Sequence, residues 1–325
     1  MTHLDVGYTN GVIAAREKYL LKEKIVRFCG LNAEDAFRAL LDSGFGGGAE
    51  TATSVYDYEK LIAAEEARLD EFIREYAPSE AEKAYLLSSH DFHNAKALIK
   101  SNYLHVDAER MLAPQGMVNT ELISACLEKG DFSSLNEFNS YLGGACEAAV
   151  EFLKEDSSGS KLGEIFEKAQ YAYLWNVAKK KNTLKQLLIA KVDMTNILIA
   201  FRCASSESAQ EKYLPFGSLN AQTLEKLFDE DMEKRQNALK NTPYADFATK
   251  CFAAKEKGLP TSEAEKIRDG YDAAFFEKRK YELSKNEPFL YYVYRRRMEC
   301  ANVRIVFVCL LAGMSEADVK KRLRA

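Results

Sequence analysis

Proline placement sets the strongest limit on the fold of this chain. Apolar residues recur every three or four positions through long stretches such as YEKLIAAEEARLDEFIREYA (58–77) and EAEKIRDGYDAAFFEKRKYELSK (263–285), which is the spacing of an amphipathic helix. A proline inside a helix removes a hydrogen bond and clashes with the preceding turn. All six prolines fall between the periodic segments, at 78, 114, 215, 243, 260 and 288. Runs of alternating β-branched residues are nearly absent, so the sequence predicts an all-α fold.

Charge and cysteine usage narrow the class of protein. The net charge of -4 argues against a dedicated nucleic-acid binder, which normally carries a basic surplus. The cysteines are scattered and never form a C-x-x-C pair, which is typical of core thiols in a reducing cytosol. They lie at 29, 126, 146, 203, 251, 300 and 309. The most apolar run, IVFVCLLAGM (305–314), is too short to span a bilayer, so we expect no direct membrane span.

One short pattern recurs at long intervals along the chain. An acid followed three residues later by asparagine occurs at Asp91/Asn94, Asp193/Asn196 and Glu299/Asn302. The intervals between the acids are similar, since 193 − 91 = 102 and 299 − 193 = 106. Each pair leads into a similar apolar stretch: NAKALIK, NILIAFR or NVRIVFV. A period near 100 residues is too long for a solenoid repeat and predicts a triplicated helical domain, divided at 1–108, 109–212 and 213–325.

The repeated residues favour a structural role. Residues i and i+3 share one face of a helix, so each acid and asparagine could reach together toward the unpaired backbone groups of a neighbouring helix end. A base follows two residues after the asparagine in the first and third repeats, at Lys96 and Arg304, whereas the second repeat has Leu198. We predict that these positions are structural and that the chain holds no catalytic, cofactor or metal residues.

The strongest catalytic alternative rests on His90 and Asp91. An adjacent His-Asp pair on a helix is the signature of the HD phosphohydrolases, and His93 or His105 could add a further metal ligand. The other two repeats keep the acid and lose both histidines, with Val192 and Thr195 or Met298 and Ala301 in their places. A metal site would therefore belong to one repeat alone.

The glycine-rich segment GFGGGAE (44–50) raises the question of a phosphate-binding loop. A Walker loop needs Lys and then Ser or Thr after its last glycine, and a dinucleotide fold needs a preceding strand. Neither condition is met, because the preceding AEDAFRALLDS has helical spacing. We expect these glycines to end a helix and open a flexible loop.

Three longer stretches resemble one known family. They are YLLKEKIVRFCGLNAEDAFRALLDSGFG (19–46), YLLSSHDFHNAKALIKSNYL (85–104) and EPFLYYVYRRRMECANVRIVFVCLLAGMS (287–315). They are similar to the C subunits of bacterial and archaeal V/A-type rotary ATPases, and to the d subunits of eukaryotic vacuolar proton pumps. The resemblance runs from about residue 8 onward and is strongest in the first and last hundred residues. It includes the recurrent acid, asparagine and base positions, and departs from the family at Leu198.

The resemblance carries its own expectations. It implies three all-helical domains in a pseudo-threefold funnel, without catalysis or a cofactor. It also implies a place between the central shaft subunits and the proteolipid rotor ring, on the cytoplasmic side of the membrane. The protein would then couple ATP chemistry to proton or sodium transport. Two other functions stay open: an HD-like metal-dependent phosphohydrolase and a generic helical adaptor.

Overall fold

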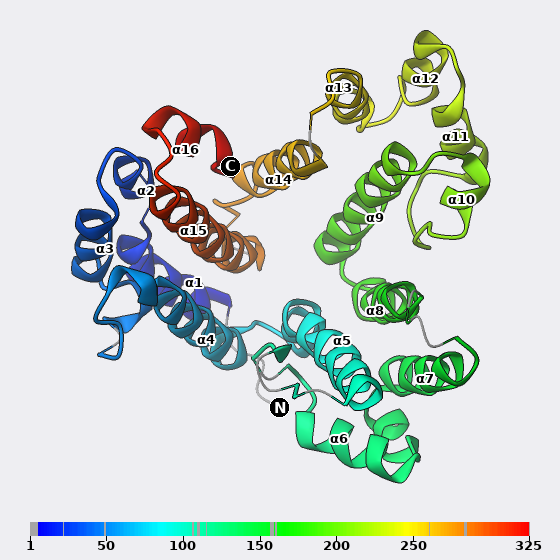
Figure 1. Cartoon of the computed structure of the whole chain (residues 1–325), viewed down its shortest axis with the longest axis horizontal. Helices are drawn as coiled ribbons and strands as arrows, with labels where there is room; N and C mark the ends of the chain where they lie inside the picture. The colour runs from blue at the N-terminus through cyan, green and yellow to red at the C-terminus, as the bar shows by residue number, and fades with distance from the viewer. Residues whose placement is uncertain are drawn as a thin grey trace. The chain divides into compact units, whose positions relative to one another are not determined.

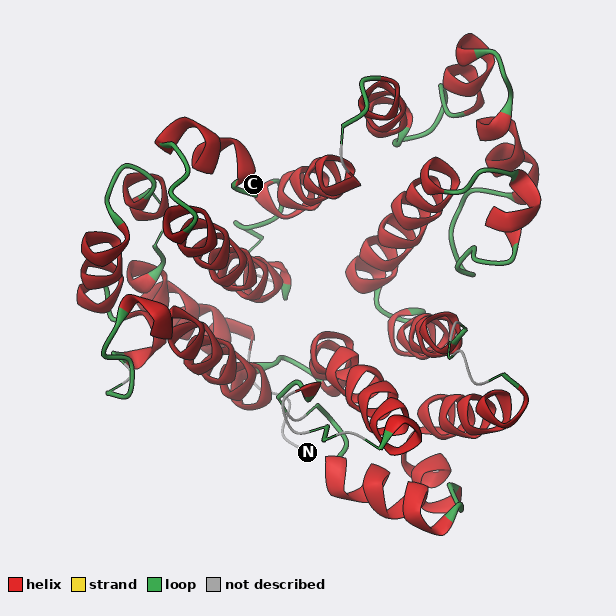
Figure 2. Ribbon diagram, in the orientation of Figure 1, coloured by secondary structure: helices red, strands yellow, loops and turns green. Residues whose placement is uncertain are grey.

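The computed structural model describes residues 6–21, 23–48, 50–105, 107–108, 111–114, 116–156, 159, 161–259, 261–282 and 285–324. Throughout these residues the regular structure is helical and contains no strand, so the predicted all-α fold is confirmed (Figure 2). The first α-helices are α1 Val6–Arg16, α2 Lys24–Phe28, α3 Ala33–Asp42, α4 Tyr58–Tyr76, α5 Glu80–Leu104, α6 Thr120–Lys129, α7 Ser133–Glu155 and α8 Leu162–Ala178. They are followed by α9 Asn182–Arg202, α10 Ser206–Gln210, α11 Ala221–Glu225, α12 Met232–Ala238, α13 Ala245–Glu256, α14 Thr261–Glu277, α15 Glu287–Leu311 and α16 Glu316–Arg322. Short 3₁₀ segments are η1 Glu17–Tyr19, η2 Phe45–Gly47, η3 Val55–Asp57 and η5 Lys226–Phe228.

Helix boundaries follow the local chemistry of the sequence. The periodic stretch 58–77 forms α4, and the proline at 78 separates it from α5. Within the stretch 263–285, helix α14 ends at Glu277. Helix α3 begins after Asn32, whose side chain accepts a hydrogen bond from the Asp35 N–H at 2.9 Å and so caps the helix.

The chain divides into two compact units, and the first joins distant parts of the sequence. This unit comprises Met1–Ser79 together with Glu265–Ala325. Within it α15 lies beside α4, so that the red C-terminal helices accompany the blue N-terminal ones (Figure 1). The two helices are antiparallel, because Phe72 stacks on Phe289 at one end while Arg304 pairs with Glu59 at the other. Their shared core includes Leu61, Ile62, Val303 and Phe307.

The second unit is continuous and comprises Glu80–Ala264. Helices α5, α7 and α8 pack together around a core that includes Phe92, Ile123, Leu142 and Phe166. Helix α9 packs against α8 on one side and α13 on another. The predicted three-domain division at 1–108, 109–212 and 213–325 remains a prediction.

Two findings concern the chain as a whole. All seven cysteines are buried, as expected for core thiols. Of the helices that the structure describes, none combines the length and the apolar character needed to cross a bilayer.

Candidate functional site

The first acid–asparagine pair holds a loop of the chain through main-chain hydrogen bonds. Asn94 pairs with both backbone groups of Ala113, accepting from its N–H at 2.8 Å and donating to its carbonyl at 3.2 Å. One helical turn earlier, the Asp91 carboxylate accepts from the N–H groups of Met117 at 3.1 Å and Val118 at 2.9 Å. Both side chains are buried. We call Asp91 and Asn94 the first clamp.

The second pair repeats this arrangement about one hundred residues later. Asn196 accepts from the Leu214 N–H at 2.8 Å and donates to the Leu214 carbonyl at 3.0 Å. Asp193 accepts from the N–H groups of Ser218 at 2.8 Å and Leu219 at 3.0 Å. The Ser218 hydroxyl also donates to this carboxylate. We call Asp193 and Asn196 the second clamp.

Glycines make room for both clamps. A β-carbon at Gly116 would lie 2.1 Å from Oδ1 of Asp91, and one at Gly217 would lie 2.3 Å from Oδ1 of Asp193. Neither distance is compatible with a side chain. The carboxylate can reach the following N–H groups only because the loop carries glycine at this point.

The clamped loops share a motif that the acid–asparagine search missed. They read APQGMVN (113–119) and LPFGSLN (214–220), and the two starts are 214 − 113 = 101 residues apart. Each motif ends in an asparagine that caps the next helix: Asn119 accepts from the Glu121 N–H and Asn220 from the Thr223 N–H. A search for proline, glycine and asparagine at shared spacing would have found the loops.

The third pair keeps the asparagine contact and changes the acid contact. Asn302 accepts from the Arg324 N–H at 2.8 Å and donates to the Arg324 carbonyl at 3.0 Å. The Arg324 side chain in turn lies 3.0 Å from Asp269 on α14. Glu299 accepts from the guanidinium of Arg296, one turn earlier on α15, at 2.8 Å. A side-chain ion pair thus stands where the first two clamps bind backbone.

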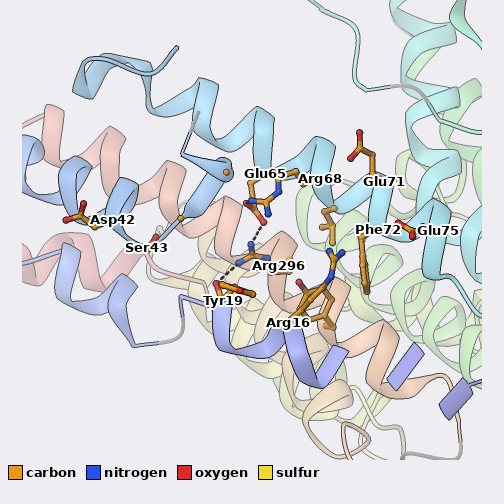
Figure 3. A pocket seen from close by; sticks show the side chains of 14 residues that line it. Arg16, Tyr19, Asp42, Ser43, Glu65, Arg68, Glu71, Phe72, Glu75 and Arg296 are labelled. Atoms are coloured by element: carbon orange, nitrogen blue, oxygen red, sulfur yellow. Dashed lines mark hydrogen bonds and ion pairs between the residues drawn. The ribbon is translucent and has the colours of Figure 1, made fainter. Parts of the chain in front are cut away.

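Arg296 lies at the centre of a buried ionic cluster in the first unit. Its guanidinium donates to Glu65 of α4 and to the Tyr19 carbonyl, the latter at 3.2 Å (Figure 3). It also donates to Glu299. Arg296 and both glutamates are buried. Burial by itself lowers the pKa of Arg296, but the two carboxylates outweigh it and raise the pKa, so the group stays charged.

Glu65 ties the glycine-rich segment to this cluster. Its second oxygen accepts from the Gly46 N–H at 2.9 Å and from Arg68 at 3.4 Å. Gly46 has φ +66, and a β-carbon there would lie 2.7 Å from the Leu61 carbonyl oxygen. Gly44, with φ +75, follows the end of α3, as expected for a helix-ending glycine. Phe45 and Gly46 are therefore packed closely against α4, where the sequence suggested a flexible loop.

A polar pocket of about 720 Å³ opens beside the cluster. It is lined by Arg16, Tyr19, Asp42, Ser43, Gly44, Gly47, Glu65, Arg68, Leu69, Glu71, Phe72, Glu75, Tyr292 and Arg296. The Arg16 guanidinium lies 4.8 Å from the centre of the Phe72 ring, a cation–π contact inside the lining (Figure 3). Because Arg296 and Glu65 bond to each other and to backbone, they serve to join helices.

Of the two histidines near Asp91, His93 contacts backbone. His93 lies with Nε2 2.9 Å from the Met111 carbonyl oxygen. His90 is half-buried on the same helix. Within the described ranges, no group of three or more His, Cys, Asp or Glu side chains is placed to hold a metal ion.

The predicted base positions differ from one another. Arg304 pairs at the surface with Glu59 at 3.0 Å and Glu66 at 3.7 Å, linking α15 to α4. Lys96 lies on α5 near Glu167 of α8; burial raises the pKa of Glu167, and the positive charge of Lys96 partly opposes that rise. The corresponding Leu198 is buried in the core. These positions do not form one site.

Comparison with protein-family models identifies the family of this chain. A family model described as ATP synthase (C/AC39) subunit matches residues 9–322, nearly the whole chain. No curated protein matches the chain significantly.

Proposed function

Because the chain belongs to the ATP synthase (C/AC39) subunit family, which comprises the C and d subunits of V-type ATPases, we propose that it is a non-catalytic part of the central stalk of a V/A-type rotary ATPase. In this role it is a socket between the central shaft and the proteolipid rotor ring. It turns with them and transmits torque, which links ATP chemistry to proton or sodium transport. The family match over residues 9–322 carries this proposal.

The clamps supply the mechanical property that such a part needs. A torque coupler has to transmit strain, and loops between helices are usually the parts that yield. Here each of two loops is held at both ends by a buried aspartate and asparagine. The four main-chain hydrogen bonds of each clamp hold the residues on either side of the loop's turn to one helix. We assign Asp91, Asn94, Asp193 and Asn196 this structural role.

The ionic cluster makes the first unit rigid in a similar way. Arg296 joins α15 to α4 and to the backbone at Tyr19. Buried ion pairs add little net stability but fix the arrangement of the helices that carry them, because any other arrangement leaves a charge unpaired. Glu299 and Asn302 belong to this bracing, and Arg304 extends it to the surface.

The three-domain division is part of the proposal. The clamped loops, which start at 113 and 214, follow closely on the proposed boundaries at 108/109 and 212/213. Each clamp would then fix the place where the next domain begins. A pseudo-threefold funnel is the arrangement that the family resemblance implies for three such domains.

A phosphohydrolase site at His90 and Asp91 has weaker support. Both oxygens of Asp91 accept main-chain N–H groups, and His93 contacts a main-chain carbonyl. These contacts engage both Asp91 oxygens and one His93 nitrogen, atoms that a metal ion would use.

A tagged pull-down from gently solubilised membranes tests the proposal. We expect the tagged chain to recover the proteolipid ring and the shaft proteins, whereas a tagged unrelated helical protein recovers neither. The pure protein should show no ATPase or phosphatase activity with added Mg²⁺, Mn²⁺ or Zn²⁺. Recovery of neither partner, from membranes whose ATPase stays intact, would count against the rotor role and favour the adaptor. Metal-dependent hydrolysis lost in His90→Ala would favour the phosphohydrolase.

A further inference from the structure

Phe216 has a backbone conformation that is unusual for a large side chain. Its φ is +73, and His105 is the only other non-glycine residue with positive φ among those the structure describes. In this left-handed region the β-carbon crowds the following carbonyl oxygen, so bulky residues avoid it. A cost of this kind persists only where the surroundings impose it.

The second clamp imposes the positive φ on Phe216, because it fixes the backbone before and after that residue. Before Phe216, Asn196 fixes the backbone of Leu214, and Pro215 fixes its own φ near about −65°. After Phe216, Asp193 holds the N–H groups of Ser218 and Leu219. Phe216 therefore has to supply the turn that brings the chain from one anchor to the other.

An aromatic stack opposes the strain. The Phe216 ring lies parallel to that of Trp175 on α8, with centroids 5.1 Å apart and an interplanar angle of 7°. The Lys185 ammonium lies 5.6 Å from the centre of the Trp175 ring. Phe216 is still 37% exposed, so burial alone does not hold its ring in place.

We propose that Trp175 and Phe216 form a strained aromatic latch on the loop between α10 and α11. While the rings are stacked, Phe216 stays left-handed and the Asp193 contacts stay closed. When the rings part, Phe216 relaxes to an ordinary backbone conformation, and the Ser218 and Leu219 N–H groups leave Asp193. The latch thus controls the direction in which the chain enters α11. This inference does not depend on the proposed function.

The first clamp offers a comparison within the same chain. The residue at the position of Phe216 there is Gln115, which lies outside the described residues and carries no ring. The anchors at Asp91 and Asn94 are otherwise the same. The latch is therefore specific to the second loop.

Hydrogen exchange of the Ser218 and Leu219 amides in the full chain tests the latch. Removing the stack by Phe216→Ala or Trp175→Leu should speed exchange there roughly tenfold, the upper range for an aromatic pair. Phe216→Gly also lacks the ring but removes the strain, so its exchange should be slower than that of Phe216→Ala. In the Phe216→Gly background, Trp175→Leu should add no further change. The matched control Phe138→Ala removes an exposed ring from α7 and should leave these amides as in the parent.

Fluorescence gives a second reading, because Trp175 is the only tryptophan of the chain. Acrylamide should quench Trp175 more strongly in Phe216→Ala than in the parent or in Phe138→Ala. If Phe216→Ala loses helical circular dichroism, Phe216→Leu replaces it, since leucine keeps the strain and bulk without a ring. Unchanged exchange in the ring-deletion variants would overturn the latch. So would a glycine variant that exchanges as fast as the alanine variant, because the strain would then have no effect.

Discussion

The carboxylate of Asp193 occupies the space that a side chain at position 217 would need. A β-carbon on Gly217 would lie 2.3 Å from Oδ1 of Asp193, well inside van der Waals contact. The same relation joins Asp91 and Gly116 at 2.1 Å. Each aspartate can bind the backbone beyond the glycine only because the glycine has no side chain.

Gly217→Ala should therefore destabilise the protein. The methyl group has to push the loop off Asp193, which leaves a buried carboxylate without its donors and costs about 2–4 kcal/mol of unfolding free energy. Gly144→Ala is the matched control, because a β-carbon at that position in α7 meets nothing within 4 Å. It should raise stability by up to about 1 kcal/mol, through helix propensity. Urea unfolding measures the stability of both variants, and equal changes in unfolding free energy would contradict the steric argument.

Each clamping asparagine should contribute a similar amount to the free energy of unfolding. Asn94→Ala, Asn196→Ala and Asn302→Ala each leave one backbone N–H and one carbonyl without partners. The expected loss is about 1–3 kcal/mol in each case, the usual range for orphaned buried groups. Asn237→Ala, at an exposed position of α12, should change stability far less. Melting curves of all three variants that coincide with the parent would rule out the bracing role.

Breaking the buried ionic cluster should lower the unfolding free energy more than breaking a surface ion pair. Arg296→Met removes the cation that the buried Glu65 and Glu299 share, at an expected loss of about 3–5 kcal/mol. Arg304→Ala breaks an ion pair whose side chains are 42% and 50% exposed, and should cost less than about 1 kcal/mol. Adding Glu65→Gln and Glu299→Gln to Arg296→Met should restore part of the loss in denaturant unfolding. A triple variant no more stable than the single one would show that lost packing, rather than unpaired charge, explains the effect.

Asp70 should make stability depend on pH. Burial raises its pKa to about 6, although Arg297 and Arg74 partly oppose the rise. The folded state thus binds this proton more tightly than the unfolded chain, whose aspartate pKa is about 4. Stability from this group is greatest below about pH 4 and is lost as pH rises through 6.

Asp70→Asn should remove that dependence. At pH 8 the variant should be more stable than the parent by about 1–3 kcal/mol, and at pH 4 the two should be equal. Glu71→Gln, which neutralises an exposed neighbour on α4, should leave the pH profile of the parent unchanged. Chemical unfolding at a series of pH values gives the comparison. A constant difference between Asp70→Asn and the parent at every pH would contradict the assignment.

The cysteines should be inert in the folded protein. All seven are buried, and burial raises the pKa of Cys146 and of Cys251 to about 12. Since only the thiolate reacts, a thiol reagent at pH 8 should label almost none of them within minutes. In guanidinium chloride it should label all seven. Rapid labelling of the folded chain would mean that part of the core opens readily.

The sequence predicted the helices better than their contacts. Periodicity and proline placement locate α4 and its end before residue 78, because both are local properties of the chain. Residues at i and i+3 share one face of a helix, so the spacing of Asp91 and Asn94 predicts that they point together, with helix ends as their expected partners. The structure has them bind the loop ahead of α6, because helix spacing says which residues point together and not which backbone they meet.

Contacts between residues far apart in the sequence could not be predicted from sequence patterns. Arg296 and Glu65 are 231 positions apart, and arginines and glutamates are too common for any spacing to single out that pair. The proline–glycine–asparagine motif of the clamped loops could have been found, since it recurs after 214 − 113 = 101 residues. It was missed because a search built on acids does not see glycines.

The pairing of α4 with α15 has a consequence for the order in which a growing chain can fold. During synthesis the second unit is complete once residue 264 has emerged, because it is drawn from one continuous stretch. The N-terminal part of the first unit has to wait longer. Leu61, Ile62 and Glu65 can meet Phe45 and Gly46 early, but they meet Arg296, Val303 and Phe307 only when the last part of the chain has been made. For most of translation, therefore, α4 is without the apolar cover that α15 supplies, and exposed apolar surface of this kind is what makes incomplete chains prone to aggregate.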